Sequence, residues 1–175
     1  MESAMSALRV FGILLTVWIA VTVPEIAAAG TLAAPTGPVV LTVTGRIANT
    51  NAGKAAEFDI AMLEALPGRT ARVNTPWAEG VNDFQGPLTR AVLEAVGAEG
   101  AKLKVIALND YSAEVPAEDF IKHDVILALK KNGAYLPVRN QGPIFVIYPF
   151  DLNPGLYNEV YFSRSVWQVK SIEVQ

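Results

Sequence analysis

The residue types that most often carry enzyme chemistry are scarce in this sequence. Its 175 residues contain a single histidine, His123, and no cysteine. Zinc, copper and iron–sulfur sites of the usual kinds need several Cys or His ligands, so the composition excludes them. His123 could serve as the base of a Ser-His-Asp system, but no nucleophile elbow accompanies it. We therefore expect His123 to be a surface loop residue, and we assign no catalytic residue and no metal ligand.

Four closely spaced carboxylates are the next group that could do chemistry. Glu114, Glu118, Asp119 and Asp124 could supply the oxygen ligands that Ca²⁺ prefers. Their spacing does not match an EF-hand loop, and no glycine-rich phosphate loop follows a predicted strand. We interpret the four residues as a solvated acidic loop.

Polar and aromatic residues in predicted loops are better candidates for a binding site. The sequence Asn109-Asp110-Tyr111 is typical of a tight turn, because Asn and Asp hydrogen-bond their own backbone, and Asp110 and Tyr111 could also border a pocket. Arg139 is the best candidate for contact with an anion or a carbonyl, with a plain surface arginine as the alternative. The aromatic residues that could line a pocket or fill the core are Trp77, Phe84, Tyr111, Tyr148 and Trp167.

The elements that must position these residues are mainly strands. Residues 39–47 and 165–174 alternate apolar with polar or small side chains, a pattern typical of half-buried strands. Asn132-Gly133 lies between two apolar runs and predicts a hairpin. Further strands are expected at residues 70–74, 102–108, 125–129 and 144–148.

Two helices have clear sequence signals. Asp59 can cap a short helix that runs through Leu66, and Pro87 fits the first turn of a second helix that ends at Gly97. One helical turn is expected at residues 118–122, whereas residues 75–86 are expected to be irregular. Strands dominate over few short helices, so the sequence predicts an α+β fold with a mixed β core.

The N-terminal residues are expected to lie outside the fold. Residues 10–23 are apolar but fall short of the roughly 20 residues that span a bilayer, and Ala27 and Ala29 suit a cleavage site. We interpret residues 1–29 as a cleavable signal peptide, residues 30–38 as a linker and residues 39–175 as a single domain. Cleavage predicts a periplasmic or secreted protein with no stable membrane span, and an uncleaved anchor is the alternative.

The charge of the chain restricts its partners. The net charge is −3, and removal of residues 1–29 takes away Glu2, Arg9 and Glu25 and leaves −2. The sequence contains no Lys/Arg run that would attract nucleic acid, and no basic amphipathic face for anionic lipid. We expect a small-molecule ligand or an envelope protein as the partner.

Several short sequence motifs occur between Phe58 and Val174 in an order that is typical of one protein family. Together they resemble the molybdopterin-binding domain of the sulfite oxidase superfamily, and in particular its small exported single-domain relatives. The resemblance implies a sulfite-oxidase-like fold. The motifs include Phe84-Gln85-Gly86-Pro87-Leu88, Asn109-Asp110-Tyr111, Asn132-Gly133-Ala134-Tyr135-Leu136, Gly142-Pro143 and residues 167–174.

The resemblance also implies a cofactor site from which this sequence departs. Catalytic members bind molybdenum through a cysteine thiolate, but Asn74-Thr75 stands in that stretch here. Members of the family hold the cofactor phosphate with an arginine just after a Gly-x-Pro turn and with lysines near the last strand. In this sequence the strand after Gly142-Pro143 has no arginine. Arg164 stands near the position of one expected lysine, and Trp167 stands near the position of the other. The candidate cofactor-binding residues are Asn74, Trp77, Asp110, Tyr111, Arg139 and Arg164.

These departures lead to two functional hypotheses. The first is an exported molybdopterin-binding-domain-like protein that lacks conventional molybdenum redox catalysis and acts as a ligand-binding or interaction module. The alternative is a divergent molybdopterin-dependent oxidoreductase of the periplasm. Molybdopterin is the cofactor that the resemblance implies, while the residue content argues against it.

Overall fold

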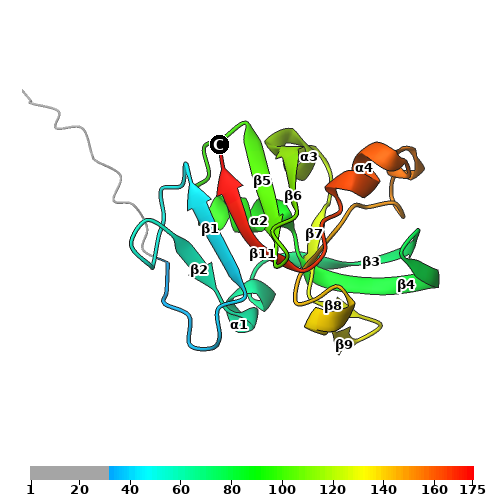
Figure 1. Ribbon diagram of the computed structural model, residues 1–175, viewed down its shortest axis with the longest axis horizontal. Helices are drawn as coiled ribbons and strands as arrows, with labels where there is room; N and C mark the ends of the chain where they lie inside the picture. The colour runs from blue at the N-terminus through cyan, green and yellow to red at the C-terminus, as the bar shows by residue number, and fades with distance from the viewer. Residues whose placement is uncertain (1–31) are drawn as a thin grey trace, which may run out of the picture.

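A five-stranded mixed sheet forms one half of the molecule (Figure 1). The computed structural model describes residues 32–175; the predicted signal peptide and the first two linker residues lie outside the described residues. The strand order is β2-β1-β11-β5-β6, in which only β1 and β11 are parallel. The strands are β1 Leu41–Gly45, β2 Ala56–Phe58, β5 Lys102–Ala107, β6 Ser112–Pro116 and β11 Val169–Val174.

The other half is built on a long hairpin that extends away from this sheet (Figure 1). The hairpin belongs to a sheet of order β3-β4-β8-β9, and β10 pairs with β7 beside it. Asn132 and Gly133 turn the chain between β8 and β9 with φ of 51° and 81°, which confirms the predicted hairpin. The strands are β3 Gly68–Thr75, β4 Ala78–Pro87, β7 Ile126–Ala128, β8 Lys130–Lys131, β9 Ala134–Tyr135 and β10 Phe145–Ile147.

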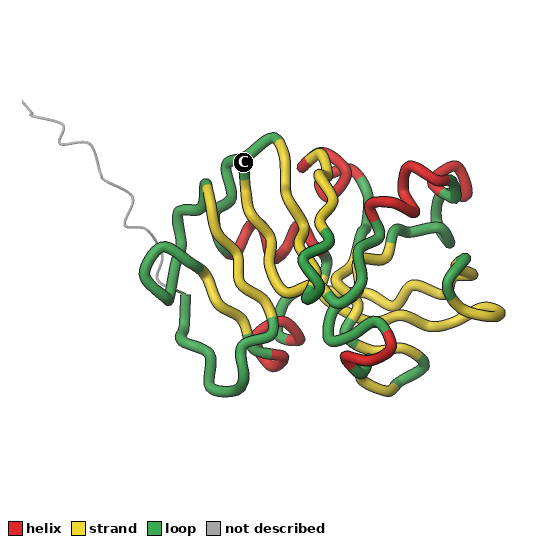
Figure 2. The backbone as a smooth tube through the Cα atoms, viewed as in Figure 1, coloured by secondary structure: helices red, strands yellow, loops and turns green. Residues whose placement is uncertain are grey.

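Short helices connect the strands and cover their faces (Figure 2). Gly97 has a φ of 59° just beyond α2, which confirms its role as a helix stop. Pro87 is the last residue of β4 and not the first turn of α2, so that prediction was wrong. The helices are α1 Ile60–Glu64, α2 Thr89–Ala95, α3 Ala117–Lys122 and α4 Glu159–Arg164, with 3₁₀ turns η1 Val138–Asn140 and η2 Pro154–Leu156.

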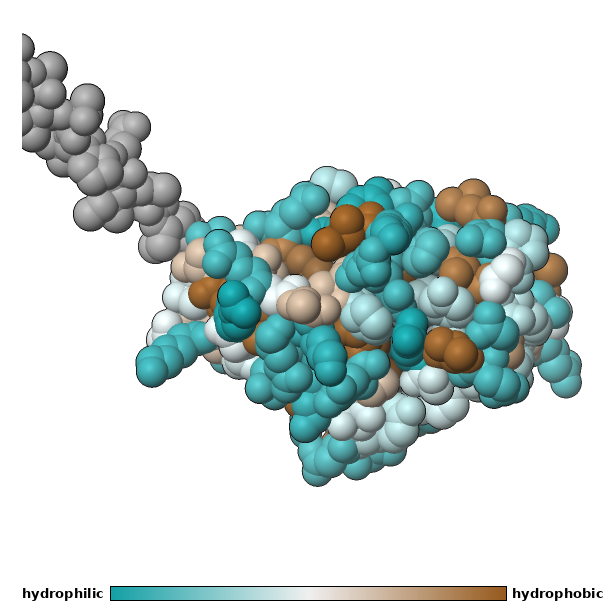
Figure 3. Space-filling view, turned by 90° about the horizontal axis from the view of Figure 1, so that it is seen from above, coloured by the Kyte–Doolittle hydropathy of each residue, from teal (hydrophilic) through white to brown (hydrophobic). Residues whose placement is uncertain are grey.

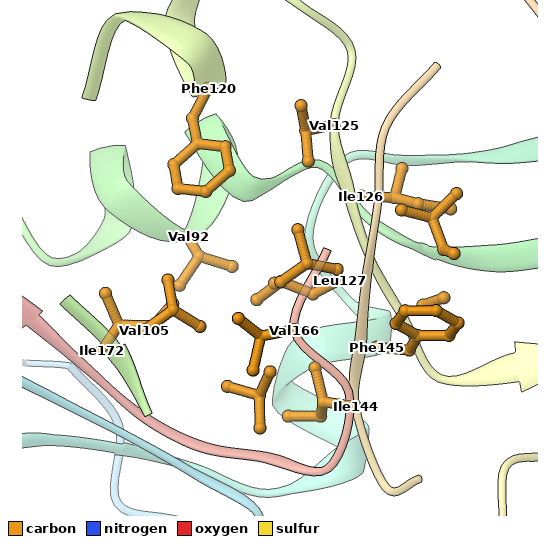
Figure 4. Close-up of a cluster of buried hydrophobic side chains, with 14 of the residues drawn as sticks. Val92, Val105, Phe120, Val125, Ile126, Leu127, Ile144, Phe145, Val166 and Ile172 are labelled. Atoms are coloured by element: carbon orange, nitrogen blue, oxygen red, sulfur yellow. The ribbon is translucent and has the colours of Figure 1, made fainter. Parts of the chain in front are cut away.

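The apolar faces of the sheets and helices meet in one core (Figure 4). Val92 of α2 and Phe120 of α3 pack over the five-stranded sheet, on the side of Val105 and Ile172. Phe145 and Leu127 continue the core into the second half of the molecule. The observed architecture is the α+β fold with a mixed β core and short helices that the sequence predicts.

Two segments differ from the sequence-based prediction. Residues 75–86, expected to be irregular, contain most of β4, which pairs with β3 along its whole length. The last strand begins at Val169, later than predicted, and a register shift between Val169 and Ser171 interrupts its pairing with β5. Val169 and Ile172 are therefore both fully buried, which strict alternation over residues 165–174 does not allow.

Asp59 joins the segment before the first strand to helix α1. Its carboxylate accepts hydrogen bonds from the backbone N–H groups of Met62, Gly37 and Thr36, each at 2.8 Å. The Met62 bond is the predicted N-cap of α1. The other two tie the described part of the predicted linker to the domain, a contact that its small and proline-containing composition does not reveal. These hydrogen bonds, that from Met62 first, lower the pKa of Asp59.

Replacing Asp59 with asparagine is expected to lower the Tm at neutral pH by about 3–6 °C. Asparagine offers one oxygen where the carboxylate uses two, and its amide group would oppose the donor N–H groups. Because the folded pKa lies below the usual 3.8, the carboxylate stabilises the fold above that value and loses this effect as the pH falls through the folded pKa. Thermal melts of wild type and Asp59→Asn should therefore converge in acid. Glu99→Gln is the control variant for the same melts. A Tm difference between wild type and Asp59→Asn that persists unchanged below about pH 3 would contradict this account.

Candidate functional site

Two indole rings form the centre of the candidate site. Trp77 lies in the turn between β3 and β4, and Trp167 lies two residues before β11. Their ring centroids are 6.0 Å apart at an interplanar angle of 81°. Both rings contact the buried ring of Phe145 edge to face, at 5.5 Å for Trp77 and 6.0 Å for Trp167. Phe145 of β10 thus fixes both indoles to the core, while Trp167 remains 40% exposed.

A cleft of about 340 Å³ lies against these two indoles. Tyr111 forms one wall from the β5–β6 turn, and its hydroxyl donates a hydrogen bond to the backbone oxygen of Ser163 at 3.3 Å. Helix α4 forms another wall through Phe162, whose ring meets that of Trp77 at 5.6 Å. The lining is mainly aromatic and apolar, with small polar groups at its edge.

A second cleft, of about 380 Å³, shares both indoles with the first. Its wall is η1 and the residues that follow it, held to the start of β11 by Gln168. The backbone N–H of Gln168 donates to the oxygen of Gln141 at 2.9 Å, and its side chain donates to the oxygen of Val138. Arg139 lies exposed on this wall, and it forms no ion pair with any residue among 32–175.

The turn that carries Tyr111 has the predicted geometry. Asp110 has a φ of 65°, and Asn109 Oδ1 accepts a hydrogen bond from the backbone N–H of Tyr111 at 3.1 Å. Lys170 Nζ donates to Asp110 Oδ1 at 2.6 Å, and this hydrogen bond lowers the pKa of Asp110. The tight-turn interpretation is confirmed, and the turn directs Asp110 to Lys170 while Tyr111 lines the first cleft.

Asn74 lies outside the cavities that Trp77 borders. Side chains alternate across β3, so Thr75 is buried and Asn74 is exposed on the opposite face. Asn74 lines a separate hollow of about 190 Å³ that also includes Tyr157. Thr75 Oγ1 is buried and has no hydrogen-bond partner among the described residues. The structure therefore separates Asn74 from Trp77 and Tyr111, which the sequence analysis grouped with it.

Arg164 is held by an internal ion pair. Its Nη1 donates to Asp119 Oδ2 at 2.8 Å, and the hydroxyl of Tyr148 donates to the same oxygen at 2.8 Å. The guanidinium also lies 5.5 Å from the ring centroid of Tyr161. Burial raises the pKa of Tyr148 far above its ordinary value, and the Asp119 carboxylate adds to this rise. The network joins α3, α4 and the end of β10, and thereby fixes the helix that walls the first cleft.

The remaining acidic residues do not form a separate loop, which corrects that prediction, whereas His123 lies in a loop as predicted but is half-buried. Glu114 is on β6, Glu118 is on α3, and Asp124 pairs with Arg90 at 2.5 Å. His123 directly follows α3, half-buried, and its ring meets that of Tyr161 edge to face at 6.3 Å. Within residues 32–175, no three Asp, Glu, His or Cys side chains are grouped closely enough to hold a metal ion.

The predicted aromatic set divides between core and cleft. Phe84 and Tyr148 are fully buried core residues, whereas Trp77, Tyr111 and Trp167 line the clefts. Sequence reasoning missed the contribution of α4, which supplies Phe162 and Ser163. A usable signal was Asn158, whose side chain caps this helix by accepting a hydrogen bond from the N–H of Val160 at 3.0 Å.

Comparison with known protein families identifies the fold. Residues 46–175 match the family described as oxidoreductase molybdopterin binding domain. The chain belongs to this family. A molybdopterin-binding domain of the oxidoreductase family therefore accounts for most of the chain, as the ordered motifs in the sequence predict.

A solved structure supports the same fold assignment. The sulfane dehydrogenase SoxCD from Paracoccus pantotrophus superposes with a TM-score of 0.56 at 18% sequence identity. The match covers 77% of this chain but only 37% of that protein chain, so the likeness concerns the fold alone. A comparison with curated proteins gives no match. Among residues 32–175, every helix is too short or too polar to cross a bilayer.

The side chains at this site do not fit the molybdenum-bearing form of the cofactor after which the family is named. At the end of β3, where the resemblance implies a thiolate, the chain has Asn74 and Thr75, and a hydroxyl is a hard donor unlike sulfur. Of the two predicted cations, Arg164 is paired with Asp119, which leaves Arg139 at the clefts. A cofactor phosphate usually has several charged partners. Both the metal ligand and the phosphate anchors are therefore deficient.

Proposed function

We propose that the chain is an exported member of this family that acts as a ligand-binding or interaction module and carries out no conventional molybdenum redox reaction. The observation that carries the proposal is the donor set. No cysteine exists anywhere in the 175 residues, and the buried hydroxyl of Thr75 lies in the stretch where the resemblance implies a thiolate. Without a soft sulfur ligand, the fold retains its clefts but lacks the metal-binding group.

The clefts beside Trp77 and Trp167 support the binding part of this proposal. Ligand pockets in proteins are concave, mostly apolar and supplied with a few well-placed polar groups. Two cavities of about 340 and 380 Å³ share one aromatic wall, and Arg139 offers a cation at its edge. A small molecule is the ligand that suits these volumes. An envelope protein that inserts a side chain into a cleft is the second type of partner.

Export rests on the sequence of residues 1–29. The apolar stretch at residues 10–23 and the small residues Ala27 and Ala29 support cleavage near Gly30. Fractionation of cells that express the chain, followed by intact mass measurement, tests this part. We expect a periplasmic product that begins near residue 30. A full-length product retained in the membrane fraction would contradict cleavage.

Family membership favours the alternative, a divergent molybdopterin-dependent oxidoreductase of the periplasm that uses a metal environment without cysteine. Native mass spectrometry separates the two possibilities. The chain is purified from a host that makes the molybdenum cofactor, and its mass is measured before and after denaturation. We expect no adduct with the mass of molybdopterin or of its molybdenum complex. A stoichiometric adduct of either mass would contradict our proposal and support the oxidoreductase.

A further inference from the structure

The Trp77–Trp167 pair presents aromatic surface to the clefts, with Trp167 exposed and Trp77 half-buried. Indoles exposed in this way present large apolar faces at low conformational cost, and flat rings pack well against them. Trp167 is 40% and Tyr111 is 52% exposed, although both rings are large and apolar. Leu108 and Val138, 45% and 54% exposed, lie near the same rim, since Gln168 hydrogen-bonds the backbone of both. Figure 3 shows that apolar residues form separate patches on one face, among polar ones.

Arg139 adds a charge that nothing in the described fold neutralises. Four other arginines have carboxylate partners: Arg69 pairs with Asp151, Arg72 with Asp83, Arg90 with Asp124 and Arg164 with Asp119. Arg46 also forms no ion pair with the described residues, but it lines neither of the two clefts. Arg139 instead lies on η1, at the cleft that shares both indoles. A guanidinium presents a planar set of donors that matches a carboxylate, sulfonate or phosphate group.

The two clefts share their aromatic wall, so one ligand can contact both. A ring in the first cleft would contact Trp77 and Trp167, which also line the second cleft together with Arg139. The charge of Arg139 disfavours a cation in this position. The walls near Phe162 and Val166 disfavour a ligand that is polar throughout, because its groups would lose water without gaining partners.

We propose that the paired clefts bind a flat aromatic anion, with the ring on the Trp77–Trp167 wall and the anionic group on Arg139. This inference rests on the proposed ligand-binding function and names the chemical class of its ligand. It requires no metal and no bond to the protein. The ligand is held by aromatic contact and by one charge-assisted interaction.

The two tryptophans of the exported protein, Trp77 and Trp167, provide a direct readout, because Trp18 belongs to the proposed signal peptide and is absent after cleavage. Each gives one indole N–H signal in a ¹H–¹⁵N spectrum of the protein that begins near residue 30. Trp77→Phe and Trp167→Phe assign the two signals. The probes are naphthalene-1-sulfonate and its neutral counterpart 1-naphthalenemethanol, which share a ring and differ in charge.

We expect naphthalene-1-sulfonate to shift the indole N–H signals of Trp77 and Trp167 saturably. The neutral probe should bind at least about tenfold more weakly. Arg139→Gln should weaken the anion about tenfold and leave the neutral probe unchanged, whereas the matched variant Arg46→Gln, at an exposed arginine away from the clefts, should change neither. Trp167→Ala should weaken both probes, and a Tm within a few degrees of wild type verifies that each variant is folded.

Three results would overturn the inference. If the two probes bind with equal affinity, or if Arg139→Gln leaves the affinity for the anion unchanged, the ligand need not be an anion. The proposed ligand-binding function would still stand in that case. Failure of both probes to move either indole signal would reject the aromatic ligand altogether. A molybdopterin adduct in native mass spectrometry would instead contradict the proposed function itself, whatever the probes do.

Discussion

Replacing Gly86 with alanine is expected to destabilise the fold strongly. A Cβ at this position would lie 2.0 Å from the backbone oxygen of Leu127 and 2.9 Å from the Cα of Ala128. Gly86 lies where β4 crosses β7, and the N–H of Leu129 donates to the oxygen of Gln85 at 2.8 Å beside it. Because both neighbours are backbone in the core, neither can move aside without loss of this junction. We expect a loss of at least about 4 kcal/mol in the free energy of unfolding.

The measurement is a thermal melt of Gly86→Ala beside wild type and Gly37→Ala. Gly37 is the matched control, because its added Cβ would come no closer than 3.5 Å to another heavy atom, the Asp59 Oδ2. We expect Gly86→Ala to be insoluble or to melt roughly 10 °C or more below wild type, and Gly37→Ala to melt within about 2 °C of it. A Gly86→Ala protein that melts with wild type would show that the two strands do not cross as closely as described.

Asp119→Ala is expected to have the second-largest effect. The change leaves the guanidinium of Arg164 without its carboxylate, and it removes the acceptor of the fully buried Tyr148 hydroxyl. The Arg164 and Asp119 side chains are 24% and 12% exposed, so removal of one partner leaves the other charge partly desolvated and unpaired. We expect a decrease of about 2–4 kcal/mol in the free energy of unfolding, measured by urea denaturation. The first cleft should lose its ligand as well, since α4 forms its wall.

Glu118→Ala is the control for this change. Glu118 is the neighbour of Asp119 on α3 and pairs with Lys122, but both side chains are more than 60% exposed, so its loss should be too small to resolve. The double variant Asp119→Ala/Arg164→Met should recover part of the lost stability, because it removes the unpaired charge. Equal effects of Asp119→Ala and Glu118→Ala, or no recovery in the double variant, would mean that the network does not hold α4.

Local patterns in the sequence predict most strands and two helices of the fold. Alternation located β1 and most of β11, the Asn-Gly pair located the β8–β9 hairpin, and Asp59 located the start of α1. β4 was missed because its outer half, Ala78 to Val81, is mostly exposed and contains Gly80, so no apolar alternation marks it. Its strand conformation comes from pairing with β3, which only tertiary structure provides.

The short C-terminal elements were hidden for a related reason. Helix α4 has six residues and none is buried, so it carries no apolar stripe. It is held in place by Phe162, which packs on Trp77, and by Arg164, which reaches Asp119. Both contacts join residues far apart in sequence. A pattern read along the chain cannot report them.

The candidate site was predicted in part. Trp77, Tyr111 and Arg139 each line at least one of the two clefts, as their loop positions suggested. Asn74 does not, because the pleat of β3 points it away from the buried Thr75. Arg164 does not, because Asp119 lies within hydrogen-bonding distance in the folded chain. Strand pleat and ion pairing over long sequence separations decided these two cases.

The central claim is that this molybdopterin-binding-domain fold has lost its molybdenum site. The most direct test is the molybdenum content of the purified chain by inductively coupled plasma mass spectrometry. The chain is made in a host that supplies the cofactor, beside a cysteine-containing member of the family as the positive control. We expect about one molybdenum per chain in the control and less than about 0.05 in this protein, in line with its lack of a soft thiolate donor. Molybdenum near one atom per chain would contradict the claim.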